Sequence, residues 1–98
     1  MTLAVAFRRA ARAEFLAAAA TYESQRPSLG AQFVAEIERC IALAAEQPNA
    51  YAVVRKNTRR VTARRFPYSA YFQAEPSRIV VLAVFHGSRD PTIWQGRA

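Results

Sequence analysis

The chain contains few of the residues on which many protein sites are built: one cysteine, one histidine and three glycines among 98 residues. A single cysteine excludes a disulfide within the chain, and Cys40 falls inside a helical pattern, so we expect it to fill space in the core. A single histidine excludes a metal site built on several imidazoles, and no glycine spacing fits a phosphate-cradling loop. A serine triad has no support either. We therefore expect neither a metal nor a cofactor.

Long apolar runs are absent as well. No stretch approaches the roughly 18 apolar residues of a membrane span, and the N-terminal sequence becomes charged after Phe7, unlike a signal peptide. The 98 residues, of which 52% are hydrophobic, are enough for one domain with a single core. We expect residues 1–98 to form one cytoplasmic domain without membrane association.

Acidic residues are scarce in the second half of the chain. Residues 1–47 hold five basic and five acidic side chains, whereas residues 48–98 hold nine basic and two acidic ones, so the second half carries the whole net charge of +7. Such asymmetry suggests an acidic or polyanionic partner, with a solvated basic face as the alternative. Six of the eleven residues from Arg55 to Arg65 are basic.

The first half has the pattern of a strand followed by two helices. Alternating apolar residues predict a short strand over 3–7, and apolar residues at helical spacing predict helices over 10–25 and 28–47, with Ser28 as the N-cap of the second. Glu36 and Glu38 are expected on a solvated face of the second helix. Two helices with a short connection form a helical hairpin.

The second half has the pattern of an antiparallel meander. Strands are predicted over 58–66, 68–75 and 79–85, joined by turns at Phe66-Pro67 and Pro76-Ser77, after a weak strand or loop over 51–54. Asp90-Pro91 predicts the start of a helical turn that carries Trp94. The fold class is α+β: a helical hairpin on a mainly antiparallel sheet in the order β-α-α-β-β-β. Arg60 and Arg64 should then lie on the sheet face opposite the core, which we expect to be concave and cationic.

The apolar run Ile79–Phe85 predicts the central strand, covered on both faces, and it leads directly into His86. His86 is either a structural residue hydrogen-bonded at the strand end or a group for phosphodiester chemistry, in which arginines stabilise the developing charge. For Arg89 and Asp90, the alternatives are a local ion pair that fixes the C-terminal segment and a functional role.

Together these features resemble the RelE/ParE superfamily of bacterial type II toxins, especially its ParE-like branch. The resemblance is strongest from Ala63 to Asp90: an arginine-rich strand, a Pro-Tyr turn into an aromatic strand, and an apolar strand that ends in His86-Gly-Ser-Arg-Asp90, followed by Trp94. It implies a small cytoplasmic toxin that a cognate ParD-like antitoxin neutralises, through an extended segment that wraps the helices and the sheet.

The superfamily implies two activities. ParE-like members inhibit DNA gyrase without nuclease chemistry of their own, whereas RelE-like members cut messenger RNA at the ribosome. RelE-like enzymes commonly have basic residues in the aromatic strand, where this chain has Ser69 and Gln73. We therefore expect a gyrase inhibitor, with a ribosome-dependent mRNA endonuclease that uses His86 and Arg89 as the alternative. The residues expected to contact the target or the antitoxin are Arg59, Arg60, Arg64, Arg65, Tyr68, Tyr71, His86, Arg89 and Trp94.

Overall fold

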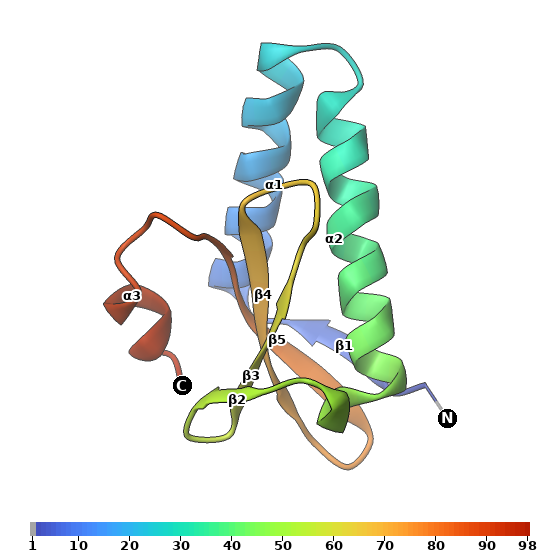
Figure 1. Ribbon diagram of the computed structural model, residues 1–98, viewed down its shortest axis with the longest axis vertical. Helices are drawn as coiled ribbons and strands as arrows, with labels where there is room; N and C mark the ends of the chain where they lie inside the picture. The colour runs from blue at the N-terminus through green and yellow to red at the C-terminus, as the bar shows by residue number, and fades with distance from the viewer. Residues whose placement is uncertain (1) are drawn as a thin grey trace.

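The computed structural model describes residues 2–98 as two long helices packed on one face of a sheet, with a short C-terminal helix on the opposite face (Figure 1). The elements follow the order β1 (Ala4–Phe7), α1 (Arg9–Gln25), α2 (Leu29–Glu46), a 3-10 turn (Pro48–Ala50), β2 (Val53–Arg55), β3 (Thr58–Thr62), β4 (Tyr68–Ala74), β5 (Arg78–His86) and α3 (Thr92–Gln95). Both long helices and the short C-terminal helix therefore lie within a few residues of their predicted positions. The α+β class is confirmed.

The five strands form one sheet in the order β1-β5-β4-β3-β2. β1 runs parallel to β5, and the other three pairs are antiparallel, so the sheet is mainly antiparallel as expected. The weak segment before the basic stretch forms the short strand β2, which extends the predicted order to β-α-α-β-β-β-β. All residues from Ile79 to Phe85 are buried, in agreement with a strand covered on both faces.

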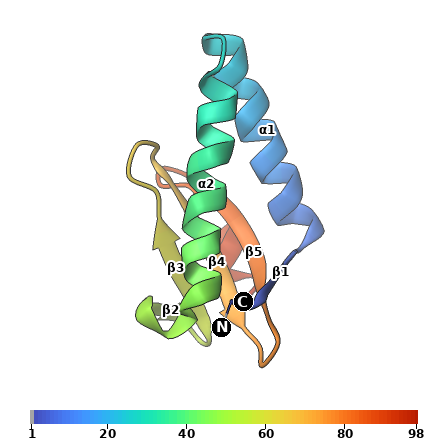
Figure 2. The same ribbon diagram turned by 90° about the vertical axis from the view of Figure 1, so that its right-hand side faces the viewer.

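The α1–α2 hairpin covers one face of the sheet (Figures 1 and 2). The helices approach closely at Gly30, where a Cβ would lie 2.6 Å from the carbonyl oxygen of Ala19, so only glycine fits there. Phe33 and Ile37 on α2 are almost fully buried and pack in one cluster with Phe72 of β4 and Ile79 of β5. The main core thus lies between the hairpin and the sheet.

A register shift between β4 and β5 decides which side chains reach the opposite face of the sheet, here called the second face. Tyr71 pairs with Ala83, but Phe72 pairs with Val81, so β5 has one extra residue at Leu82. Ile79 and Val81 face the hairpin before this bulge and Val84 faces it afterwards, while Ala83 and Phe85 turn to the second face.

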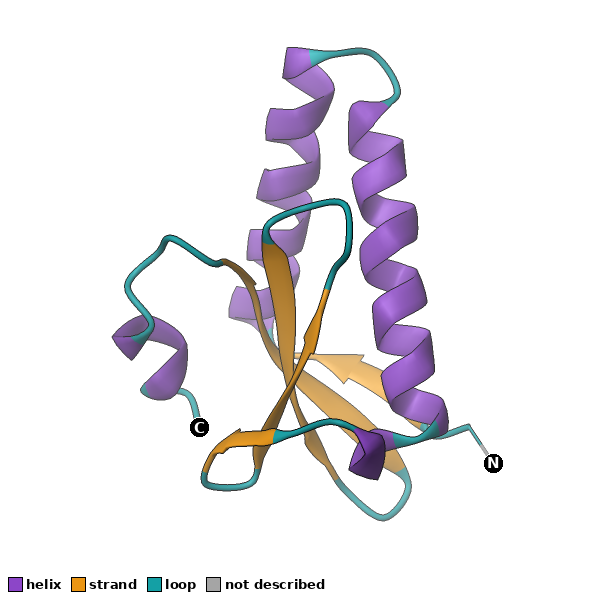
Figure 3. Cartoon of the chain, in the orientation of Figure 1, coloured by secondary structure: helices purple, strands orange, loops and turns teal. Residues whose placement is uncertain are grey.

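Several local predictions need correction (Figure 3 colours the chain by helix, strand and loop). The third strand ends at Thr62, four residues before its predicted end, because residues 64–67 form a loop closed by the hydrogen bond from Ala63 N to Tyr68 O. Ser28 occupies the N-cap of α2 in a left-handed conformation, but its side chain makes no capping bond. The Glu23 carboxylate caps α2 instead, accepting hydrogen bonds from Ser28 N and Gly30 N.

Within residues 2–98, every helix is too short or too polar to cross a membrane.

Candidate functional site

The second face carries a pocket of about 360 Å³ between the end of β5 and the C-terminal segment. Its wall is formed by side chains from β2, β3, β4, β5 and α3, together with the loop before α3. The lining residues are Val54, Arg60, Ser69, Tyr71, Phe85, His86, Gly87, Arg89, Pro91, Trp94 and Gln95. This set includes five of the nine residues predicted to contact a target or antitoxin. We call it the second-face pocket.

An aromatic cluster forms the floor of the second-face pocket. Tyr71 and Trp94 have ring centroids 4.0 Å apart, and Tyr71 packs edge-on to Phe85 at 6.5 Å. Trp94 is only 5% exposed although it belongs to a helix of four residues. Burial of this ring therefore holds α3 against the sheet, since such a short helix has little stability of its own.

Basic groups border this aromatic floor. Arg60 pairs directly with Tyr71 across β3 and β4 and is exposed. The Arg89 guanidinium lies 4.2 Å from the centroid of the Phe85 ring, a distance at which cation–π attraction is favourable. Arginine, tyrosine and tryptophan are the residues that most often dominate binding energy in protein interfaces. The pocket is therefore chemically suited to an acidic or polyanionic partner.

His86 stands at the rim, and its hydrogen bonds define the tautomer of its neutral ring. The Nδ1 atom lies 2.9 Å from Ser88 N and 2.8 Å from Ser88 Oγ. A backbone N–H can only donate, so Nδ1 accepts that bond and the proton of the neutral ring is on Nε2. The imidazole also packs edge-on against Tyr68, with the ring centroids 5.1 Å apart. His86 is thus structurally anchored, and its remaining ring nitrogen is a hydrogen-bond donor.

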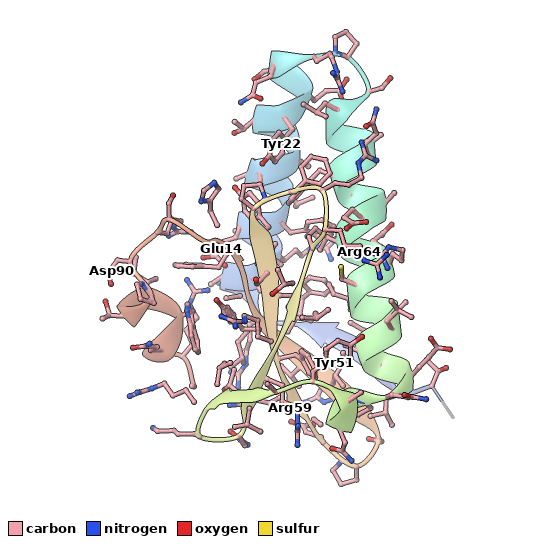
Figure 4. The ribbon with its side chains drawn as sticks, viewed as in Figure 1. Glu14, Tyr22, Tyr51, Arg59, Arg64 and Asp90 are labelled. Carbon is pink, nitrogen blue, oxygen red and sulfur yellow. The ribbon has the colours of Figure 1, made fainter. Side chains whose placement is uncertain are left out.

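The local ion pair considered for Arg89 and Asp90 does not form. Arg89 Nη1 instead lies 3.2 Å from the Glu14 carboxylate of α1, which also accepts two hydrogen bonds from Arg97. Asp90 accepts hydrogen bonds from Thr92 N and Thr92 Oγ1, and these hold the pKa of its carboxyl below the usual range. Figure 4 shows Glu14 on α1 and Asp90 beside α3. Glu14 is the residue that sequence reasoning missed, because its partners lie 75 and 83 positions away.

The four arginines expected to act as one cluster are divided between different surfaces. Consecutive strand residues point to opposite faces, so Arg59 lies on the hairpin face, where its Nη1 donates to Tyr51 O, while Arg60 lies on the second face. Arg64 and Arg65 belong to the loop after β3 and lie against α2, with Arg64 N bonded to Glu36 and Arg65 Nη2 bonded to Gln32. Figure 4 shows Arg64 beside α2. The prediction that Arg64 shares a face with Arg60 is wrong.

Tyr68 also belongs to the hairpin side. Its ring packs edge-on against Phe33 and Tyr22, with centroids 5.0 and 6.1 Å apart. Burial, reinforced by the neighbouring Tyr22, raises the pKa of the Tyr68 hydroxyl above its usual range. The hydroxyl is therefore protonated at neutral pH and is a donor rather than a base.

A second candidate surface is an apolar groove of about 470 Å³ along the outer side of the hairpin. It lies where the edge strand β1 meets α1 and α2, and Leu16 and Val5 at this groove are 57% and 42% exposed. The lining residues are Val5, Phe7, Arg12, Phe15, Leu16, Val34, Glu38, Ile41 and Ala42. We call it the hairpin groove. Helical spacing alone did not show it, because part of the apolar stripe on each helix extends past the sheet.

No group of three or more histidine, cysteine, aspartate or glutamate side chains within residues 2–98 is placed to hold a metal ion.

Comparison with known proteins adds independent information. The sequence matches the family model described as the ParE toxin of the type II toxin–antitoxin system parDE, over residues 5–91. Among solved structures, it is similar to a chain of the chromosomal ParDE toxin–antitoxin system from P. aeruginosa, with a TM-score of 0.73 and 21% sequence identity. The alignment covers 87% of this chain and 96% of that chain. No match was found among curated proteins. At such low identity the structural likeness establishes the fold alone, whereas the family match spans most of the sequence.

Proposed function

The chain belongs to the ParE toxin family of type II toxin–antitoxin systems, and we propose that it inhibits DNA gyrase by binding through the second-face pocket. In this proposal the protein acts in the cytoplasm and is neutralised by a ParD-like antitoxin that binds elsewhere on the molecule. The observation that carries the proposal is the convergence of Arg60, Tyr71, Arg89 and Trp94 on one surface. A rigid aromatic floor with arginines at its border is typical of the centre of a protein interface.

The chemistry of the pocket favours binding over RNA cleavage. Cleavage through the 2′-hydroxyl needs a base to remove a proton and an acid to protonate the leaving oxygen. His86 uses the lone pair of Nδ1 to accept the Ser88 backbone N–H, and Tyr68 is kept protonated by burial. The residues that line the pocket include no aspartate or glutamate. Gln73, where RelE-like enzymes often have a basic residue, donates hydrogen bonds to Asn57 in the turn before β3 and to Thr58 of β3.

A supercoiling assay with purified toxin and gyrase tests the target. We expect inhibition at micromolar toxin, and induction in cells should cause filamentation and a DNA-damage response. Gyrase that remains fully active at this concentration, with undisturbed DNA synthesis in expressing cells, would overturn the proposal. Primer extension on cellular messages tests the alternative: codon-phased cleavage after induction would instead identify a ribosome-dependent mRNA endonuclease.

Paired arginine variants test the surface. Arg60→Gln removes a charge from the second-face pocket, whereas Arg64→Gln/Arg65→Gln removes two charges from the loop beside α2. We expect the first change to weaken gyrase inhibition by about tenfold, which corresponds to about 1.4 kcal/mol of binding energy. The double variant should inhibit like the parent. Both variants should keep the parent melting temperature within about 2 °C, because exposed arginines contribute little to stability. If the double variant instead inhibits gyrase less than Arg60→Gln does, the gyrase-binding site lies on the α2 side of the molecule.

The hairpin groove is the surface that we assign to the antitoxin. An apolar segment of the antitoxin would cover Leu16 and Val5, and Arg12 and Glu38 at the border offer one charge of each sign. The outer edge of β1 also has unpaired backbone groups, since β1 is the edge strand of the sheet. An antitoxin segment that buries this apolar groove would stabilise the folded toxin, so toxin and antitoxin should co-purify. A toxin-only preparation that stays monodisperse and stable would count against this assignment.

A matched pair of leucine substitutions tests the groove. Leu16 lines the groove, whereas Leu43 is exposed on α2 outside it, with exposed fractions of 57% and 41%. Leu16→Asp places a charge in the apolar contact and should weaken antitoxin binding by about a hundredfold or more. Leu43→Asp makes the same chemical change and should leave the affinity within about threefold of the parent. Equal affinities for the two variants, measured by calorimetry or biolayer interferometry, would show that the antitoxin binds another surface.

A further inference from the structure

The second half of β5 lacks a neighbouring strand on one side. β1 pairs with β5 only from Arg78 to Val81, because Arg8 N donates to Val81 O and the chain then turns into α1. From Leu82 to His86 this side of β5 therefore has no β1 partner. Backbone groups on such an edge need other partners when they are buried, and Leu82 and Val84 are fully buried.

Side chains from distant parts of the chain supply these partners. The Glu14 carboxylate on α1 accepts a hydrogen bond from Val84 N at 3.2 Å, and Arg97 Nη1 donates to Leu82 O at 3.1 Å. Glu14 and Arg97 also bind each other through two hydrogen bonds of 2.9 and 3.0 Å, a bidentate pair in which both partners are mostly buried. Two side chains thus occupy the place of the missing strand.

Glu14 at the same time holds both ends of the segment that contains α3. Arg89 lies before α3 and Arg97 lies after it, and both form ion pairs with this one carboxylate. Between these two anchors, Trp94 is stacked on Tyr71. Because Arg89 and Trp94 line the second-face pocket, the position of the segment decides whether the pocket exists in its observed shape.

We propose that Glu14 is a positioning residue: by joining Arg89, Arg97 and the free edge of β5, it holds residues 89–97 over the sheet and so assembles the second-face pocket. The role of the pocket in this inference rests on the proposed function, but the positioning itself does not. Glu14 lies on the hairpin side of the sheet, so a residue of one layer organises a surface on the other. A carboxylate with donors on three different segments has few alternative arrangements, which makes it an effective constraint.

Hydrogen exchange of the purified toxin, or of its complex with the antitoxin, tests the positioning directly. The amides of Gln95 and Gly96 bond to Pro91 O and Thr92 O, so their protection reports on α3. We expect Glu14→Gln to accelerate exchange at these two amides by roughly tenfold or more, and to leave the amide of Phe72 in the core unchanged. Glu46→Gln, the same change at the exposed end of α2, is the control and should alter neither.

A second variant covers the case in which Glu14→Gln does not fold. Arg97→Gln removes the other half of the bidentate pair close to the end of the chain and should give the same local acceleration. If the two residues act through each other, the double variant should exchange no faster than the faster single variant. Arg97→Lys keeps one charge but loses the bidentate geometry, so it should restore part of the protection.

Gyrase inhibition by the same variants separates this inference from the proposed function. Faster α3 exchange together with at least fivefold weaker inhibition supports both. Faster exchange with parent-like inhibition supports the positioning role but removes the second-face pocket as the gyrase site. Unchanged exchange at Gln95 and Gly96 in both Glu14→Gln and Arg97→Gln overturns the positioning role, whatever happens to gyrase. A parent protein without gyrase activity overturns the proposed function, and the exchange data still decide the role of Glu14.

Discussion

The two faces of the sheet are stabilised in different ways. The hairpin face is covered by two helices of 17 and 18 residues, and its cluster of buried residues includes four large aliphatic or aromatic side chains that are at most 1% exposed: Phe33, Ile37, Phe72 and Ile79. The second face is covered by a four-residue helix, and its cluster contains Tyr71, Ala83, Phe85 and Trp94. The hairpin face therefore supplies most of the stability, and the second face can change with little effect on the fold.

This difference is consistent with the binding role that we propose for the second face. A surface used for binding gains from rigid aromatic and basic groups, but it does not need a core of its own. The second face obtains its rigidity from the neighbouring layer, through Glu14 of α1 and through the strand β5, which both faces share. Four measurements, in order of decreasing expected effect, would test the comparison.

Phe33→Ala should have the largest effect. Phe33 is fully buried and contacts aromatic rings of α1, β4 and the loop before β4, so its removal leaves a cavity between the layers. We expect a loss of about 3–5 kcal/mol in the free energy of unfolding, a large share of the total for a domain of this size. Urea denaturation followed by circular dichroism measures it. Leu16→Ala, at a 57% exposed position on α1, should cost less than about 1 kcal/mol. Similar losses for both would contradict the assignment of the main core.

Gly30→Ala should have the next largest effect. The added Cβ would meet Ala19 O at 2.6 Å and Glu23 Cβ at 2.9 Å, so the two helices must move apart. The expected cost is about 2–3 kcal/mol, typical of overpacking against backbone. Gly96→Ala is the matched control, because its nearest atom, Thr92 O, lies at 3.5 Å. A melting temperature of Gly30→Ala equal to that of Gly96→Ala would show that the hairpin is not closely packed at this point.

Trp94→Ala should destabilise the protein less, although it removes the largest ring of the second face. Loss of this ring releases α3 from Tyr71, but the main core remains intact. We expect about 1–2 kcal/mol, below the range for an enclosed core aromatic, because the short segment can relax. The slope of the unfolding free energy against urea concentration should be unchanged within error. Ile93→Ala, at a 44% exposed neighbour on the same helix, should cost about 0.5 kcal/mol or less. A loss for Trp94→Ala as large as that for Phe33→Ala would contradict the view that the second face is secondary for stability.

Glu36→Gln should have the smallest effect, and it should depend on pH. Hydrogen bonds from the Arg39 side chain and from Arg64 N hold the pKa of Glu36 below its usual value of 4.5. A depressed pKa in the folded state means that the carboxylate contributes stability at neutral pH, and that this contribution is lost as pH falls through and below 4.5. The parent should therefore lose more thermal stability between pH 7 and pH 3.5 than the variant does. Glu38→Gln controls for the loss of one negative charge on α2. If the parent and Glu36→Gln lose the same thermal stability between pH 7 and pH 3.5, the Glu36 carboxylate does not stabilise the contact between α2 and the loop after β3.

Local patterns were sufficient to predict most of the architecture. Helical spacing located α1 and α2 to within one residue at each end, and the β-branched run Ile79–Phe85 identified the central strand. These patterns can be recognised without the tertiary structure, because each depends only on the spacing of apolar residues within one helix or strand. The Asp90-Pro91 pair likewise predicted the turn that carries Trp94, but the N-cap of α3 is Pro91 and not Asp90, whose carboxylate instead accepts a hydrogen bond from Thr92 N. Together with the apolar strand and its polar ending, these features also indicated the toxin family that the family match confirms.

Only the tertiary structure decided how the site is assembled. The bulge at Leu82 turns Ala83 and Phe85 to the second face, and no residue type in that uniform apolar run marks its position. The early end of β3 separates Arg64 and Arg65 from Arg60, and Arg89 binds Glu14 instead of the adjacent Asp90. Long charged side chains pair with groups that are close in space, whatever their separation in the sequence. Glu14 and Arg97 are 83 positions apart, so no local pattern indicates their ion pair. The amino-acid sequence by itself determined the order of every element except β2, whereas the packing of α1 beside the free edge of β5 determined which residues meet at the second face.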